Sequence, residues 1–174
     1  MYISIDLGGT NTRLAVSTNG SSIAKKVRFP TKKEYKEQID AMRNEIDNLS
    51  ESKGIKALCI GVPGFVDYKA NKIKKVINVP YLSEFNAEDL VSDGKVLVAN
   101  DAALGGLGES LFGVAKEFET IAYITLSTGV GGIRIHNKKL NIGQKFSEPG
   151  HMIIHDTNKV SVLTNQPRCV GFFG

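Results

Sequence analysis

The sequence predicts an α/β protein, and three observations lead to that prediction. Short apolar segments of strand length alternate with stretches of helical periodicity. A glycine-rich turn follows two of these segments: Gly8-Gly9 follows Tyr2–Leu7, and Gly129-Val130-Gly131 comes shortly after Ile121–Leu126. Because the order of strand, glycine-rich turn, strand and turn occurs twice, we expect two related domains that face a cleft, residues 1–115 and residues 116–174.

Local patterns place the elements of the first domain. Its predicted strands are Tyr2–Leu7, Thr12–Ser17, Ile23–Phe29, Ala57–Val62 and Val96–Ala99. Asn19-Gly20 is a strong hairpin signal between the second and third of these strands. Five apolar residues that recur at steps of three and four predict an amphipathic helix: Tyr35, Ile39, Met42, Ile46 and Leu49.

A second helix is expected over Ala102–Phe112, with Asp101 near its N-terminus, where the helix dipole favours a carboxylate. In the second domain the pattern predicts strands over Ile121–Leu126, Gly131–His136 and His151–His155. Asn137-Lys138-Lys139 is expected to form the turn that follows the second of them.

Composition excludes several classes of protein. The 174 residues are 41% apolar and 23% charged, which is typical of a globular domain. No apolar run approaches the roughly 20 residues that span a bilayer, and no basic N-terminal region precedes an apolar stretch. Two cysteines, Cys59 and Cys169, make no disulfide framework. We therefore expect a cytoplasmic protein with no membrane partner.

The chain carries a net charge of +4. Binding of nucleic acid would also require a recognition module, and the sequence shows none. We therefore interpret the lysines as a solvated surface that favours anionic substrates, and expect no nucleic-acid partner.

The first glycine turn is a candidate phosphate-binding site. Adjacent glycines allow close approach of the backbone to a ligand, and the amides and the Thr10 hydroxyl can donate to phosphate oxygens. Asp6 can hold a cation or its waters. Thr128 and Gly129 occupy the equivalent place in the second domain. From these residues alone, a plain hairpin turn remains the alternative for both segments.

Two further segments carry polar groups suited to a sugar. Asp101 ends a predicted strand and opens a predicted helix, a common place for catalytic groups in α/β sheets, although a structural N-cap is the alternative. Asn100 offers a donor and an acceptor. Glu148 and His151 could form hydrogen bonds with adjacent hydroxyls of a sugar, or could belong to an ordinary surface loop.

Five motifs in order resemble the ROK family of sugar kinases and sugar-responsive repressors, within the actin and hexokinase superfamily. The motifs are Asp6–Thr10, Gly61–Asp67, Asn100–Ala102, Leu126–Gly132 and Glu148–Met152. The resemblance implies an actin-like, ribonuclease H-like ATPase fold, a mixed five-stranded sheet flanked by helices. It also implies that the first domain is nearly complete and the second is partial.

The resemblance implies a role for each motif. Asp101 would be the general base on the sugar hydroxyl. The groups expected around the sugar are Asn100, Glu148, His151 and the Gly64 turn, which would close over it. The groups expected around the ATP phosphates are Gly8, Gly9 and Thr10 on one side and Thr128 and Gly129 on the other. Asp6 would bind Mg²⁺, through water. Closure of the two domains on sugar would exclude water and favour transfer over hydrolysis.

Departures from the family limit these implications. Many relatives carry a zinc site built from several cysteines and one histidine, whereas His151 and Cys169 are the only candidates here. Two ligands do not make a four-coordinate structural site, so we expect no zinc. Relatives also continue through an adenosine-binding segment, so we expect a truncated chain with little or no activity alone.

The expected function is therefore ATP-dependent phosphorylation of a hexose or N-acetylhexosamine hydroxyl, and a homodimer or higher homo-oligomer is the expected assembly. A non-catalytic sugar-binding regulator, or a degenerate relative, is the alternative. The sequence opens on the first predicted strand, so we expect no DNA-binding repressor. An ATPase of the same superfamily without a sugar site is the third hypothesis.

Overall fold

The computed structural model describes most of the chain as far as residue 140. The described residues are 1–51, 53–76, 79–86, 89–92, 94–126 and 130–140. The chain groups into two compact units, Met1–Asp101 and Ala102–Gly174. The division between residues 115 and 116 that the sequence suggests stays a prediction. Among the described residues, no helix has both the length and the apolar character needed to cross a membrane.

The first unit contains a mixed five-stranded sheet with the strand order β3-β2-β1-β4-β7. The strands are β1 (Tyr2–Leu7), β2 (Asn11–Ser17), β3 (Lys25–Pro30), β4 (Ala57–Val62) and β7 (Lys95–Asn100). β1, β2 and β3 pair antiparallel, whereas β4 and β7 run parallel to β1. The five strands expected from the sequence are therefore all present, with bounds that differ by at most two residues.

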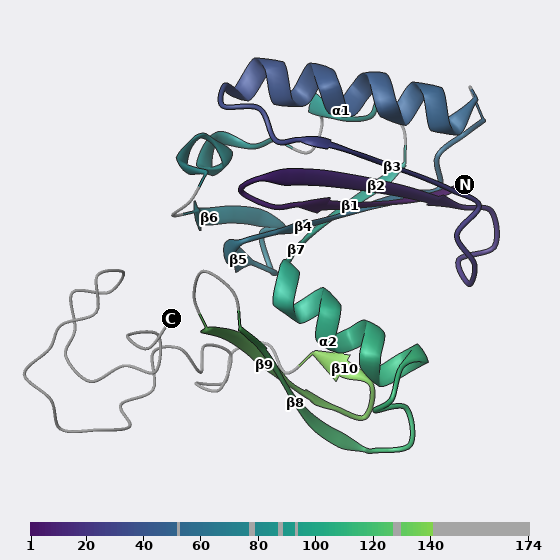
Figure 1. Ribbon diagram of the computed structural model, residues 1–174, viewed down its shortest axis with the longest axis vertical. Coiled ribbons are helices and arrows are strands. Elements are labelled where there is room, and N and C mark those ends of the chain that lie inside the picture. Colours follow the sequence, from purple (N-terminus) through teal and green to yellow (C-terminus); the bar gives the residue numbers. More distant parts are fainter. Residues whose placement is uncertain (52, 77–78, 87–88, 93, 127–129, 141–174) are drawn as a thin grey trace, which may run out of the picture. The chain divides into compact units, whose positions relative to one another are not determined.

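Helix α1 (Tyr35–Ser50) covers one face of this sheet (Figure 1). The helix and the sheet share one apolar core, in which Met42, Leu7, Leu58 and Ile60 have no exposed side-chain surface. Full burial of such a side chain contributes about 1.5–3 kcal/mol to stability. α1 ends at Ser50, and the following residue, Glu51, adopts the left-handed conformation (φ 51°) and donates its N–H to the Asp47 carbonyl.

The hairpin turn between β2 and β3 is capped by Asn19. Its side-chain Oδ1 accepts hydrogen bonds from the Ser21 and Ser22 N–H groups at 2.9 and 3.0 Å. Gly20 follows with φ 77°, a conformation that glycine adopts without strain. Ile23 was expected in the third strand, but it lies before β3 and is 67% exposed.

A second hairpin in the first unit was not predicted. It consists of β5 (Gly64–Asp67) and β6 (Lys72–Val76), and a 3₁₀ helix, η1 (Pro80–Glu84), comes shortly after it. The strands were missed because they are short and because Lys72, Lys74 and Lys75 interrupt the apolar alternation of β6. Gly64 was expected in a turn, and this was wrong, since it begins β5 and pairs with Val76.

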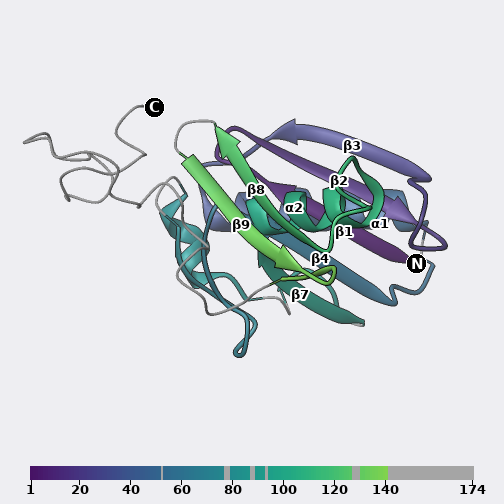
Figure 2. The ribbon, with the colours of Figure 1, turned by 90° about the horizontal axis from the view of Figure 1, so that it is seen from below.

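The second unit contains α2, apart from its first residue Asp101, and an antiparallel sheet in the order β10-β9-β8. The elements are α2 (Asp101–Phe112), β8 (Thr120–Leu126), β9 (Val130–His136) and β10 (Lys139–Leu140). α2 lies along β8 and β9 (Figure 2), and Ala103 packs against Ile133 and Ile135. A Cβ at Gly106 would lie 2.8 Å from the Ile133 Cγ2, so glycine permits this close packing. Asn137 and Lys138 form the predicted turn, although Lys139 already belongs to β10. The strand expected over residues 151–155 lies outside the described residues.

Candidate active site

Three segments with predicted site residues follow the parallel strands of the first sheet. β1 is followed by Gly8-Gly9-Thr10, β4 by Pro63-Gly64, and β7 ends at Asn100 directly before Asp101. Because β1, β4 and β7 are parallel neighbours, their carboxyl ends meet at the same edge of the sheet. Ligands of open α/β sheets bind outside that edge.

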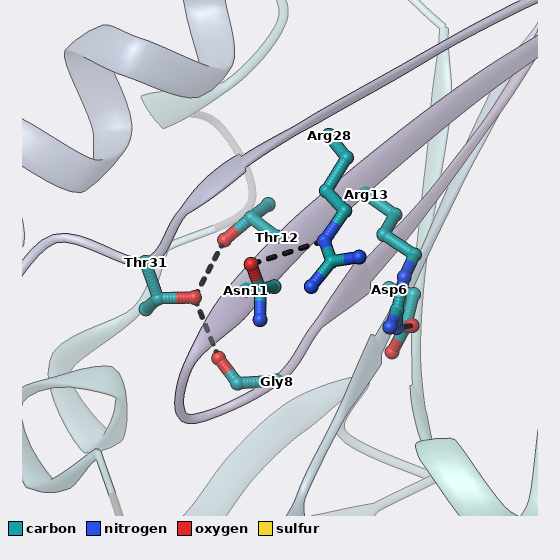
Figure 3. Close-up of polar contacts among 7 residues, drawn as sticks. All are labelled: Asp6, Gly8, Asn11, Thr12, Arg13, Arg28 and Thr31. Atoms are coloured by element: carbon teal, nitrogen blue, oxygen red, sulfur yellow. Dashed lines mark hydrogen bonds and ion pairs between the residues drawn. The ribbon is translucent and has the colours of Figure 1, made fainter.

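The glycine turn between β1 and β2 is closed by a hydrogen bond from the Gly8 N–H to the Asn11 carbonyl, at 3.0 Å. A Cβ at Gly8 would lie 3.0 Å from the same carbonyl oxygen, which explains why glycine occupies this position. Thr31, directly after β3, holds the turn from the other side (Figure 3): its Oγ1 donates to the Gly8 carbonyl at 2.7 Å. Its N–H donates to the Thr10 carbonyl at 3.0 Å.

Asp6 lies on the sheet face opposite to α1. The residues beside it on the neighbouring strands are Arg13 on β2 and Gly61 on β4, with Ala99 one strand beyond Gly61. Arg13 pairs with Asp6: the Nη1–Oδ2 distance is 2.6 Å (Figure 3), and both side chains are about half exposed. An exposed pair of this kind contributes at most about 1 kcal/mol, so Asp6 can exchange Arg13 for another cation at small cost.

The predicted sugar-binding residues Asn100 and Gly64 are in contact. The Asn100 Nδ2 donates to the Gly64 carbonyl at 3.2 Å, and the Asn100 N–H donates to the Tyr68 hydroxyl oxygen at 3.3 Å. A Cβ at Gly64 would lie 2.3 Å from the Lys75 carbonyl oxygen. Only glycine therefore allows β5 to approach β6 this closely while its carbonyl meets Asn100.

Asp101 is the first residue of α2, and its side chain is exposed. The structure thus confirms the predicted change from strand to helix at this residue. The positive end of a helix dipole favours the ionised carboxylate that a base requires. The same position suits a purely structural acidic residue, so its role as a base stays a prediction.

The β5–β6 hairpin is attached to the strand that carries Asn100. The Asn71 amide, in the turn of the hairpin, donates to the Val96 carbonyl and accepts from the Val98 N–H, both at 2.8 Å. It therefore pairs with β7 as a further strand residue would. Asn71 has φ 53°, a left-handed conformation that asparagine tolerates better than most residues.

Asp67 stabilises the same turn. Its Oδ1 accepts from the N–H groups of Lys69 and Ala70 at 3.0 Å, and its Oδ2 lies 3.1 Å from the Lys74 Nζ. The backbone bond from Ala70 and the contact with Lys74 lower the pKa of Asp67 below its ordinary value.

Several predicted site residues lie outside the described part of the chain. They are Thr128, Gly129, Glu148, His151 and Cys169. The second phosphate turn, two of the sugar contacts and both candidate zinc ligands therefore stay predictions.

A hollow of about 490 Å³ lies on the sheet face opposite to α1, near the start of β1. Tyr2, Cys59 and Leu97 line it, and none of the predicted site residues does. Burial raises the pKa of the Cys59 thiol, so the thiol stays protonated at neutral pH and is a poor nucleophile. The hollow therefore adds no catalytic group to the site.

Sequence reasoning missed the groups that hold the site segments. Gln38 is fully buried on α1, and it occupies the same helix face as Met42 and Ile46. A polar residue on an otherwise apolar stripe indicates that its side chain has a specific hydrogen-bond partner, and this signal was visible in the sequence. For Thr31, Tyr68 and Asn71 no such signal exists, because their partners are distant in the sequence.

The ROK family model matches residues 2–171. The chain belongs to the ROK family. A glucokinase from Halalkalibacterium halodurans is 27% identical over 165 residues, 88% of this chain and 50% of the relative. An N-acetyl-D-glucosamine kinase from Haemophilus influenzae is 29% identical over 161 residues, 87% of this chain and 52% of the relative. The chain thus spans about half the length of these curated relatives.

A solved ROK structure confirms the fold class. A ROK family glucokinase from Streptomyces griseus, in complex with glucose and AMPPNP, matches with a TM-score of 0.71 and 27% identity. The match covers 88% of this chain and 51% of the glucokinase chain. The actin-like ATPase fold expected from the five motifs is therefore present, in part of its full length.

Proposed function

We propose that this chain supplies the sugar-side part of a kinase that transfers phosphate from ATP to a hydroxyl of a hexose or N-acetylhexosamine. Membership of the ROK family and the relatives named glucokinase and N-acetyl-D-glucosamine kinase support the reaction class. The observation that carries the proposal is the common sheet edge at which Gly8–Thr10, Gly64 and Asn100-Asp101 lie.

In the proposed reaction the sugar hydroxyl oxygen attacks the γ-phosphorus of ATP. The hydroxyl proton passes to the Asp101 carboxylate, the bond from the γ-phosphorus to the bridging oxygen breaks, and ADP leaves. Asn100 orients the sugar together with Glu148 and His151, while its bond to the Gly64 carbonyl keeps the β5–β6 hairpin against it. In this proposal the three side chains would hold the hydroxyl in line with the phosphate, and such positioning is a large part of catalysis in phosphoryl transfer.

The turn of Gly8, Gly9 and Thr10 is proposed to bind the phosphates of ATP through backbone amides and the Thr10 hydroxyl, with Thr128 and Gly129 on the other side. Asp6 fits a magnesium site, since it is a half-exposed carboxylate beside small residues, and hard cations prefer oxygen ligands. Bound Mg²⁺ would neutralise phosphate charge, and Asp6 would hold it through water.

For the 174 residues alone we propose little or no transfer, because the relatives with named kinase activities are about twice as long. The cytoplasm as the place of action and a homo-oligomeric assembly also belong to the proposal. Robust sugar-dependent ADP production by the 174-residue chain would contradict the proposed dependence on further residues.

The test is ATP consumption by the full-length protein with a panel that includes glucose and N-acetylglucosamine, together with calorimetry for sugar and nucleotide. We expect ADP production only when a suitable sugar is present. Sugar binding without turnover would contradict a kinase and favour a regulator. Turnover of ATP with no sugar affinity would contradict the sugar site.

A further inference from the structure

A chain of side-chain hydrogen bonds links α1 to the glycine turn. The Gln38 Nε2 donates to the Thr12 Oγ1 at 3.1 Å, the Thr12 and Thr31 hydroxyl oxygens are 3.0 Å apart, and the Thr31 Oγ1 donates to the Gly8 carbonyl at 2.7 Å. Figure 3 shows the last two of these contacts beside the turn. We name Gln38, Thr12 and Thr31 the threonine relay.

The geometry gives the threonine relay one direction. Thr31 has a single hydroxyl proton, which it donates to the Gly8 carbonyl, so the Thr12 hydroxyl must donate to Thr31. Thr12 in turn accepts from the Gln38 amide. Every bond in the relay therefore runs from α1 toward the glycine turn, and bonds aligned in this way strengthen one another.

The start of the relay is fixed as well. The Gln38 Oε1 accepts the Lys32 N–H at 2.8 Å. A backbone N–H can only donate. If the Gln38 amide flipped, its NH₂ group would face the Lys32 N–H, and two donors would meet. Gln38 and Thr12 have no exposed side-chain surface, so water cannot replace either partner if one is removed.

The end of the relay determines which polar group the turn offers to a ligand. The peptide between Gly8 and Gly9 is trans, so its N–H points away from its carbonyl. Because Thr31 holds the carbonyl, the Gly9 N–H is directed away from Thr31. A peptide between two glycines can rotate at little steric cost, and the rotated form would present an oxygen to an anion instead of a donor.

We propose that the threonine relay is a positioning device that locks the Gly8–Gly9 peptide with its N–H toward the nucleotide phosphates. This inference rests on the proposed function. Gln38, Thr12 and Thr31 are positioning residues, since they act on the phosphates only through the turn.

The test measures binding of Mg²⁺-ADP to the full-length protein by calorimetry, with the melting temperature measured in parallel. Thr31→Val keeps the shape of the side chain and removes the donor, and we expect nucleotide affinity to fall about five- to tenfold, with sugar affinity unchanged. Thr31→Ser restores the hydroxyl and should restore most of the affinity. Thr12→Val leaves the Thr31–Gly8 bond in place and should give an intermediate loss.

In kinetic terms Thr31→Val should raise the KM for ATP more than it lowers kcat. Equal nucleotide affinity in the original protein and Thr31→Val would overturn the inference, and so would a loss that Thr31→Ser fails to restore. If Thr31→Val does not fold, the test is made with Thr12→Val. Unchanged nucleotide affinity in Thr12→Val would also overturn the inference. A protein that binds no nucleotide before any substitution would instead contradict the proposed function.

Discussion

The carboxylate of Asp6 and the guanidinium of Arg13 form an ion pair of 2.6 Å between β1 and β2, beside the glycine turn. The carboxylate proposed to hold Mg²⁺ through water therefore already has a cationic partner. Since an exposed pair is worth at most about 1 kcal/mol, Mg²⁺ can compete with Arg13 for this carboxylate.

We predict that Arg13→Gln lowers the Mg²⁺ concentration required for half-maximal sugar phosphorylation, by up to about fivefold, because it removes the competing cation. A magnesium titration of the kinase activity measures this. Arg28→Gln is the matched control, since it removes the same charge from a residue that donates to Asn11. A magnesium requirement that rises in Arg13→Gln, or that changes equally in both variants, would contradict the competition.

Asn71→Gly is predicted to destabilise the fold by about 1–3 kcal/mol, because the Val98 N–H and the Val96 carbonyl both lose their partner. Glycine keeps the left-handed conformation of residue 71, so no strain in the folded state adds to the loss. Denaturant unfolding measures the free energy. We also expect weaker sugar binding, since the hairpin carries Gly64. If the free energy of unfolding and the sugar affinity both stay unchanged, the attachment of the hairpin to β7 is dispensable.

Gly64→Ala is predicted to disrupt the pairing of β5 with β6, because the new methyl group would lie 2.3 Å from the Lys75 carbonyl oxygen. Calorimetry should show a loss of sugar affinity of at least about tenfold, in keeping with the cost of backbone displacement in a tightly packed site. Gly54→Ala is the control, since a Cβ there meets no atom within 4 Å. An alanine at position 64 that leaves sugar binding intact would remove Gly64 from the site.

The lowered pKa of Asp67 predicts a dependence of stability on pH. A carboxylate whose folded pKa is below its ordinary value of 3.8 stabilises the fold at neutral pH, and this contribution is lost as the pH falls from that value through the folded pKa. Asp67→Asn should therefore lose less stability than the original protein between about pH 5 and about pH 2. Urea unfolding across this pH range measures the free energy of unfolding of each variant. Asp40→Asn is the control, since Asp40 is an exposed carboxylate on α1. Parallel pH profiles for Asp67→Asn and the original protein would refute the assignment.

The parts of the fold that follow from local pattern could be predicted. β1 and β4 have the expected bounds, since β1 alternates buried apolar with exposed residues and β4 is a short apolar run. α1 follows its stripe of apolar residues. The change from strand to helix at Asp101 was predictable for the same reason. These elements depend on residues that are only a few positions apart, so a single sequence is enough to predict them.

The groups that hold these motifs in place depend on contacts between distant residues. Thr31 meets Gly8 across 23 positions, and Asn71 meets Val98 across 27. Single threonines and asparagines occur in any surface loop, so nothing local separates these from the rest. β6 was missed because its lysines face outward from a two-stranded hairpin and hide the apolar alternation.

The transfer of phosphate with and without the Asp101 carboxylate tests the proposed mechanism most directly. Asp101→Asn keeps the shape of the side chain but cannot accept the hydroxyl proton. We predict that this variant loses sugar phosphorylation by about 10²–10⁴-fold or more while its sugar affinity, measured by calorimetry, stays unchanged. Unchanged turnover in Asp101→Asn would contradict the assignment of Asp101 as the base.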